Sequence, residues 1–156
     1  MIERNLTIDD LGLISEWFKH SSEWIKEEGM LKEEIGPQRI GVWMSLYDRY
    51  KGDWLVWEDN GSTKGLSYHI LHAPSNKRPW IGMVMVDPLF RGDGYGRQII
   101  QLLSGKLQKE HFKIVYAGCP FTQIGWLQFL AACRFEQIGT DTLPSGKRYI
   151  KLVRPL

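Results

Sequence analysis

The segment from residue 80 to residue 100, WIGMVMVDPLFRGDGYGRQII, constrains the fold of this chain more than any other. An apolar run that ends at Asp87-Pro88 predicts a buried strand, and the glycine-rich turn of residues 91–96 leads into an amphipathic helix. Glycines permit positive φ and let a ligand approach the backbone closely. The N–H groups that open the helix can hold an anion. The segment therefore predicts a strand, a loop and a helix arranged around a pyrophosphate-like group.

Two common phosphate-binding motifs do not account for this loop. A P-loop has Lys and then Ser or Thr after its last glycine, whereas Gly96 is followed by Arg97 and Gln98. A dinucleotide fingerprint needs a third glycine where Arg97 stands, and a carboxylate ending a following strand near residue 117, where there is none. A nucleotide-binding protein is therefore the weakest of the hypotheses that the loop allows.

The hydrophobic patterns of the remaining residues predict a single α/β domain. Strands are expected at 2–8, Trp54–Glu58, Gly65–His72, Trp80–Val86, 113–118, 135–140 and 147–153. Helices are expected from Thr7 or Asp9 to about His20, from Pro37 to about Lys51, over 94–111 and over 123–134, with a loop or short helix in 23–36. This order predicts a mostly antiparallel meander that is followed by one strand–helix–strand crossover.

A third loop pattern, R/Q-x-x-G-x-G/A after a strand that ends V-x-P, is matched at every fixed position by Val86-Asp87-Pro88 and by Arg91–Gly96. The segment resembles motif A of the GCN5-related N-acetyltransferase (GNAT) superfamily. The order of the expected strands and helices is similar to that of the superfamily over nearly the whole chain. The resemblance implies one GNAT-like domain over residues 1–156, with a mixed, mostly antiparallel sheet flanked by helices.

The resemblance implies that the chain is an N-acetyltransferase. Acetyl-CoA would be the co-substrate, and a primary amine of a small molecule or peptide would attack it directly in a ternary complex. The pyrophosphate would lie on the N–H groups of residues 92–97, and the pantetheine arm would pair with the backbone of Val84 and Val86. The N–H of Val86 or of a neighbour would face the thioester oxygen. The residues expected to bind acetyl-CoA are Val84, Met85, Val86, Arg91, Gly92, Asp93, Gly94, Tyr95, Gly96, Arg97 and Gln123.

The last expected helix departs from the pattern N-x-x-A-x-x-F-Y-x-x-x-G-F that is common in the superfamily. Gln123 stands in place of Asn, and its amide can still hydrogen-bond to CoA. Arg134 stands in place of Gly, and Leu130 in place of a Tyr that often protonates the leaving thiolate. Because Leu130 cannot donate a proton, either another group is the acid or the thiolate leaves without one. The alternative hypothesis is therefore a non-catalytic module of the same fold that binds or senses acyl-CoA.

The attacking amine must be neutral, so a general base or a chain of waters is needed. Strand 80–86 has no carboxylate, and the candidates on adjoining strands are Glu58, Tyr68, His69 and His72. Tyr68 and His72 share one face of an alternating strand and His69 lies on the other, and Tyr68 could also act as the acid. Each of these residues could instead have a structural role at the surface or in the core. A covalent mechanism through Cys119 would need a thiol of low pKa with a base partner, and the sequence suggests none.

Composition excludes several other classes of protein. The 20 basic and 18 acidic side chains leave a net charge of +2, which argues against a nucleic-acid partner. Two cysteines make no disulfide framework, and no Cys/His cluster has metal-ligand spacing. The N-terminus lacks the layout of a signal peptide, and the apolar runs are far shorter than the ~20 residues of a membrane helix. A cytoplasmic protein without metal or membrane contact is expected, and a homodimer is compatible with the sequence.

The acceptor is less well specified than the co-substrate. Residues 23–34 contain five glutamates and two lysines. In the superfamily this segment usually walls the acceptor site. A negative wall near Trp24 and Trp43 would suit a cationic amine such as a polyamine, an aminoglycoside or a lysine side chain, although a solvated acidic face would have the same composition.

Overall fold

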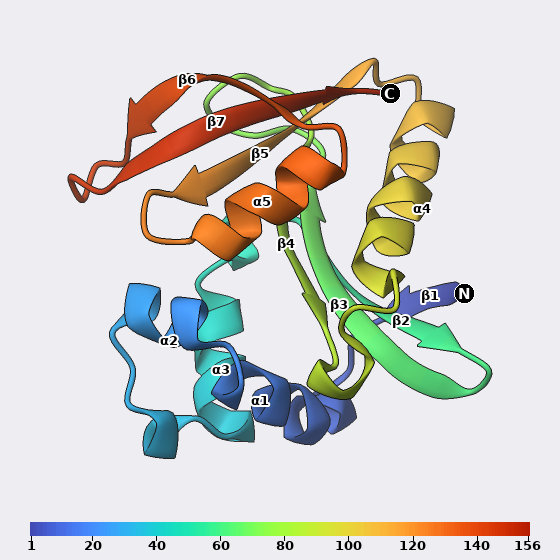
Figure 1. Cartoon of the computed structure of the whole chain (residues 1–156), viewed down its shortest axis with the longest axis vertical. Coiled ribbons are helices and arrows are strands. Elements are labelled where there is room, and N and C mark those ends of the chain that lie inside the picture. The colour runs from blue at the N-terminus through green and yellow to red at the C-terminus, as the bar shows by residue number, and fades with distance from the viewer.

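A computed structural model describes all residues, 1–156, and its seven strands form one sheet in the order β1-β2-β3-β4-β5-β7-β6 (Figure 1). The strands are β1 (Ile2–Asn5), β2 (Asp53–Asp59), β3 (Ser62–Ile70), β4 (Trp80–Val86), β5 (Ile114–Pro120), β6 (Glu136–Thr142) and β7 (Arg148–Pro155). All neighbours pair antiparallel except β4 and β5, which are parallel and joined by a helical crossover. The mixed, mostly antiparallel sheet expected from the sequence is confirmed.

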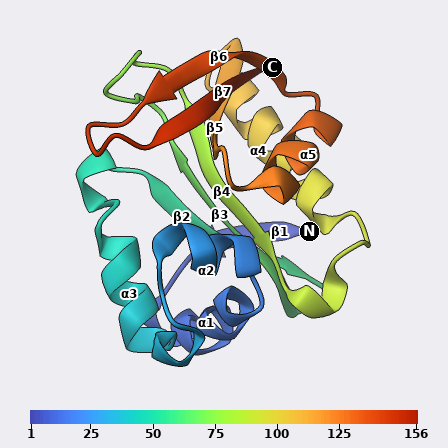
Figure 2. The ribbon, with the colours of Figure 1, turned by 60° about the vertical axis from the view of Figure 1, so that its left-hand side comes forward.

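Helices cover both faces of the sheet (Figure 2). They are α1 (Leu11–Lys19), α2 (Ser22–Glu28), α3 (Pro37–Ser45), α4 (Tyr95–Lys109) and α5 (Ile124–Ala132). Helices α4 and α5 pack on one face and α1 to α3 on the other, so each face has its own apolar core. The alternation of side chains along β2 explains why there are two cores. Leu55 and Trp57 belong to the core under α4 and α5, whereas Val56 belongs to the core under α1 to α3. No helix is both long and apolar enough to cross a bilayer.

Several boundaries differ from those expected. The first strand ends at Asn5, because Thr7 and Asp10 form a capping box that opens a 3₁₀ turn before α1. The third helix begins at Pro37 as expected but ends at Ser45, and a separate 3₁₀ turn follows it. Strand β3 begins and ends earlier than expected, at Ser62 and Ile70, so that His72 lies outside it.

The parallel pair β4–β5 is very short. Only Trp80 with Tyr116 and Ile81 with Ala117 are paired, after which the two strands separate. On the other side of β4 the register with β3 shifts, so that Gly82 is an extra residue with no partner. Such a bulge bends and twists a strand locally. Residues 82–86 of β4 therefore have β3 on one edge and no strand on the other.

His69 yields a prediction on the pH dependence of stability. Its side chain is 2% exposed, its Nδ1 has no hydrogen-bond partner, and burial lowers its pKa below the usual 6.5. The unfolded chain therefore takes up a proton below pH 6.5 that the folded chain does not, and stability is lost as the pH falls through 6.5. We expect the free energy of unfolding to fall between pH 7 and pH 5, and His69→Leu to reduce that slope by up to about 1.4 kcal/mol per pH unit.

Urea denaturation at several pH values measures the slope directly. His20→Gln, at an exposed histidine, is the control and should keep the wild-type slope. If the free energy of unfolding of His69→Leu changed with pH as steeply as that of the wild type, the pH dependence would not come from His69.

Candidate functional site

A groove of about 970 Å³ opens where β4 and β5 separate. Its walls come from β4, the loop that leads into α4, the first turn of α4, the end of β5, helices α5 and α2, Trp43 of α3 with the following Tyr47, and the turn between β6 and β7. In Figure 1, α5 lies above α2, and β4 runs downward to the right of α2. Segments distant in sequence therefore meet around one unpaired strand edge.

The open edge of β4 presents backbone groups in a fixed alternation. The N–H of Asp87 donates to the carbonyl of Lys64 on the β3 side, and the residue pairs of β3 and β4 continue from there in register. Because alternate residues of a strand direct their N–H and C=O groups to opposite edges, Met85 faces β3 while Val84 and Val86 face the groove. An extended ligand can hydrogen-bond to these two residues as an added strand would.

The glycine loop has the backbone conformation that an anion site requires. Gly92 and Gly94 both have φ of 88°, and a Cβ added to either would point into open space. Gly94 is the N-cap of α4 and supplies no side chain to its free N–H groups. The N–H groups of the first turn therefore remain available to an anion. Gly96 has another role, because its Cβ would lie 2.8 Å from Phe129 of α5.

The side chain of Arg91 connects two walls of the groove. Its Nε donates to the carbonyl of Val86 at 3.1 Å, and its terminal nitrogens donate to the carbonyl of His20 and to Ser21 Oγ. Burial lowers the pKa of the guanidinium, which stays charged at neutral pH. Arg91 thus joins the glycine loop to the start of α2, while the carboxylate of Asp87 caps the preceding turn at the N–H of Leu89.

Helix α2 is bound to the far side of the groove through two glutamates. Glu23 Oε1 accepts the N–H of Gly125 in the first turn of α5, at 2.9 Å. Glu27 accepts the hydroxyl of Thr122, and its other oxygen lies 3.4 Å from Lys147 Nζ. Helix α2 therefore bridges the groove, in contact with the β5–α5 connection and with the β6–β7 hairpin.

Aromatic rings form the base of the groove below α2. Trp24 and Trp43 pack edge to face at 5.2 Å, and Tyr47 packs on Trp43 at the same distance. All three line the groove, and burial followed by the charge of Glu28 raises the pKa of Tyr47 to about 12. Tyr47 therefore keeps its phenol proton at neutral pH.

Nearly all the residues expected to bind acetyl-CoA line this groove. They are Val84, Met85, Val86, Arg91, Gly92, Gly94, Tyr95, Gly96, Arg97 and Gln123. Asp93 is exposed in the loop and does not line the groove. Sequence reasoning missed Tyr47 and the part played by Lys147, because neither belongs to a motif and both reach the groove through tertiary contacts.

The candidate bases Glu58, Tyr68, His69 and His72 all lie outside the lining of the groove. Glu58 is paired with Arg4, which also binds Asp10. Tyr68 is 4% exposed and donates its hydroxyl to the carbonyl of Tyr47 at 3.0 Å, so it lies one layer below the groove. His72 follows β3 and packs against Phe112, with 5.8 Å between ring centroids.

Cys119 and Leu130 are both buried in the core that includes α4 and α5. The thiol of Cys119 donates to the carbonyls of Pro120 and Gln123, and burial raises its pKa to about 11. A thiol in this state is a poor nucleophile. Leu130 is 0% exposed, and its apolar side chain cannot donate a proton.

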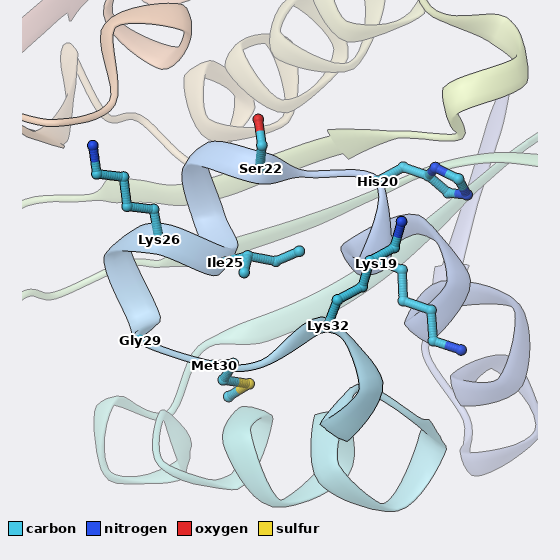
Figure 3. Close-up of a pocket in the computed structure, with 8 residues that line it drawn as sticks. All are labelled: Lys19, His20, Ser22, Ile25, Lys26, Gly29, Met30 and Lys32. Carbon is cyan, nitrogen blue, oxygen red and sulfur yellow. The ribbon is translucent and has the colours of Figure 1, made fainter.

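A second hollow of about 640 Å³ lies on the outer side of the α1–α2 connection. Three lysines and His20 surround it, and Figure 3 shows Lys32 extending toward His20 while Lys26 points away. No strand residue lines it. Nowhere in the chain do three or more His, Cys, Asp or Glu side chains gather in a way that could hold a metal ion.

Comparisons with known proteins agree with this geometry. The model of the acetyltransferase (GNAT) family matches residues 13–132. The "uncharacterized protein YkzC" of Bacillus subtilis strain 168 is 38% identical over 125 residues, or 80% of this chain and 87% of that protein. An acetyltransferase structure from Thermus thermophilus is 18% identical and covers 99% of this chain and 96% of its own, with a TM-score of 0.75.

A second solved structure adds a ligand to the same fold. The yncA structure from Salmonella typhimurium, solved with its cofactor acetyl-CoA, is 15% identical and has a TM-score of 0.63. The match covers 99% of this chain and 93% of that one. At such identities the likeness concerns the fold.

The environment of Cys119 predicts a thiol that resists alkylation. At pH 8 a thiol with a pKa of about 11 is almost wholly protonated, and this one is also 0% exposed. We expect iodoacetamide to leave Cys119 of a Cys133→Ser variant unmodified for hours in the folded state and to modify it within minutes in denaturant, as measured by mass spectrometry. Rapid labelling of the folded variant at pH 8 would show an accessible thiolate and contradict this environment.

Proposed function

Because the chain belongs to the GNAT acetyltransferase family, we propose that it transfers the acetyl group of acetyl-CoA to a primary amine of a small molecule or peptide. The acetyltransferase domain would span residues 1–156, and the transfer would take place in a ternary complex. The observation that carries the proposal is the groove that joins the open edge of β4 to the free first turn of α4.

The residues of the groove fit acetyl-CoA in shape and in chemistry. The first-turn N–H groups of α4 and the open space beside Gly92 and Gly94 suit a pyrophosphate. The outward N–H groups of Val84 and Val86 and the outward C=O of Val84 suit the amides of the pantetheine arm, while the C=O of Val86 accepts from Arg91. The solved relative from Salmonella typhimurium, with acetyl-CoA bound, supports the same assignment.

The chain positions and polarises the reactants. Acetyl-CoA supplies an activated acetyl group when bound. The N–H of Val84 or Val86 donates to the thioester oxygen, so that it stabilises negative charge as the amine nitrogen bonds to the carbonyl carbon. The carbon–sulfur bond then breaks and the thiolate leaves. Since Leu130 is apolar and buried, the proton that the thiolate takes up comes from water in the groove.

The amine loses its proton to water as well. Glu58, Tyr68 and His72 do not line the groove, and Glu58 is already paired with Arg4. The proposal therefore gives these three residues structural roles. Tyr68 holds the carbonyl of Tyr47 and with it the aromatic base of the groove. An open groove lets water carry the proton away.

Gly94→Val tests the placement of the pyrophosphate. The variant adds a branched side chain at φ of 88°, where the backbone has to meet the ligand. We expect titration calorimetry to show no binding of acetyl-CoA by this variant at millimolar ligand, whereas the wild type binds.

The matched control is Gly105→Ala, in the interior of α4, where an added Cβ meets nothing. It should bind as the wild type does and gain about 0.5–1 kcal/mol of stability. Unchanged affinity in a folded Gly94→Val variant would contradict the placement.

A panel of primary amines separates the enzyme from a non-catalytic sensor of acyl-CoA. Free CoA thiol is measured as a function of time with acetyl-CoA and each amine in turn. We expect CoA thiol to be released in the presence of at least one of the amines, and the acetylated form of that amine to appear in the mass spectrum. Tight binding of acetyl-CoA with no turnover across the panel would overturn the enzymatic proposal in favour of the sensor.

A further inference from the structure

The α2 side of the groove contains three glutamates, of which two are already engaged. Glu23 accepts the N–H of Gly125, and Glu27 interacts with Thr122 and Lys147. Glu28 also lines the groove, but no hydrogen bond or ion pair involves it. It is therefore the carboxylate of α2 that can still take up a cationic partner.

Glu28 lies beside the aromatic base of the groove. It follows Trp24 by four residues, so the two side chains share one face of α2. Glu28 and Tyr47 line the same groove, and the charge of Glu28 contributes, after burial, to the raised pKa of Tyr47. Trp43 packs edge to face with both Trp24 and Tyr47, and Trp24 and Trp43 are about 95% buried. A carboxylate next to aromatic rings is a combination that favours an alkylammonium ion.

The other charges at this end of the groove do not cancel Glu28. Lys147 is the basic residue that lines it there, and its ammonium lies 3.4 Å from Glu27 and donates to the carbonyl of the same residue at 3.2 Å. Arg91 is turned toward His20 and Ser21, at the start of α2 rather than at its end. A cation that enters below the last turn of α2 therefore meets a net negative wall.

We propose that the acceptor is a dicationic amine, an alkyl diamine or a longer polyamine, whose non-reacting ammonium binds between Glu28 and the half-buried ring of Tyr47. The inference rests on the proposed function, since it concerns the acceptor end of the same groove. The two amines of such a molecule have different tasks. The one at the thioester must lose its proton in order to attack, whereas the other keeps its proton and anchors the molecule. Glu28 is then a specificity-determining residue and takes no part in proton transfer.

Direct binding tests the anchor without any turnover. Putrescine and n-butylamine are titrated calorimetrically into the protein, with and without saturating CoA. We expect putrescine to bind at least about tenfold more tightly than the monoamine in the wild type. Glu28→Gln should remove most of that difference. Glu33→Gln, the same change at an exposed glutamate outside the groove, should retain it.

Kinetics give an independent readout. The ratio of kcat/KM for putrescine to kcat/KM for n-butylamine should fall about tenfold in Glu28→Gln, mainly through the KM for putrescine, and should stay at the wild-type value in Glu33→Gln. An equal ratio in Glu28→Gln and the wild type, with equal affinities in the titrations, would overturn the proposal.

The two proposals fail in different ways. If putrescine binds in a manner that depends on Glu28 but no amine is acetylated, the diamine site stands and the enzymatic function is wrong. If monoamines are acetylated as efficiently as diamines and Glu28→Gln changes neither, the enzyme stands and the diamine site is wrong.

Discussion

The separation of β4 from β5 is the constraint on which the rest of the structure depends. The two strands are parallel for only two residue pairs, and the bulge at Gly82 coincides with the point where they part. A parallel pair normally buries both partners under crossover helices. Here the crossover helix α4 starts at the open end, so its free N–H groups, the outward backbone of Val84 and Val86 and the glycine loop all face one groove.

Such a gap in a sheet has to be stabilised from other parts of the chain. The two apolar cores lie on opposite faces, and the groove runs between the elements that cover them. Arg91 connects the glycine loop to α2, and Glu23 and Glu27 connect α2 to the β5–α5 connection and the last hairpin. These contacts are exposed or half-buried, where each ion pair or hydrogen bond contributes modestly. Together they set the width of the groove and leave Glu28 free.

The sequence predicted the parts of the site that local rules determine. The bounds of β4, the glycine loop and the start of α4 follow from an apolar run, a proline and three glycines, whose conformations depend on residues near them in the chain. The seven strands and their mixed sheet could also be predicted, since periodicity reports burial directly.

The positions of the catalytic candidates relative to the groove could not be predicted from local sequence rules. The sequence places Glu58 and His72 on strands that adjoin the predicted thioester site. In the structure Glu58 is ion-paired with Arg4, and β3 ends before His72, which lies away from the groove. Tyr47 and Lys147 reach the groove only through packing of α2, α3 and the β6–β7 hairpin. Long-range contacts of this kind leave no periodic pattern in the sequence.

Amide hydrogen exchange, measured by NMR on the wild type with and without acetyl-CoA, tests the central claim most directly. If the pantetheine arm adds to the open edge of β4, the N–H groups of Val84 and Val86 become strongly protected when acetyl-CoA binds. Met85, whose N–H faces β3, is already protected and changes little. Binding of acetyl-CoA without slower exchange at Val84 and Val86 would contradict the account.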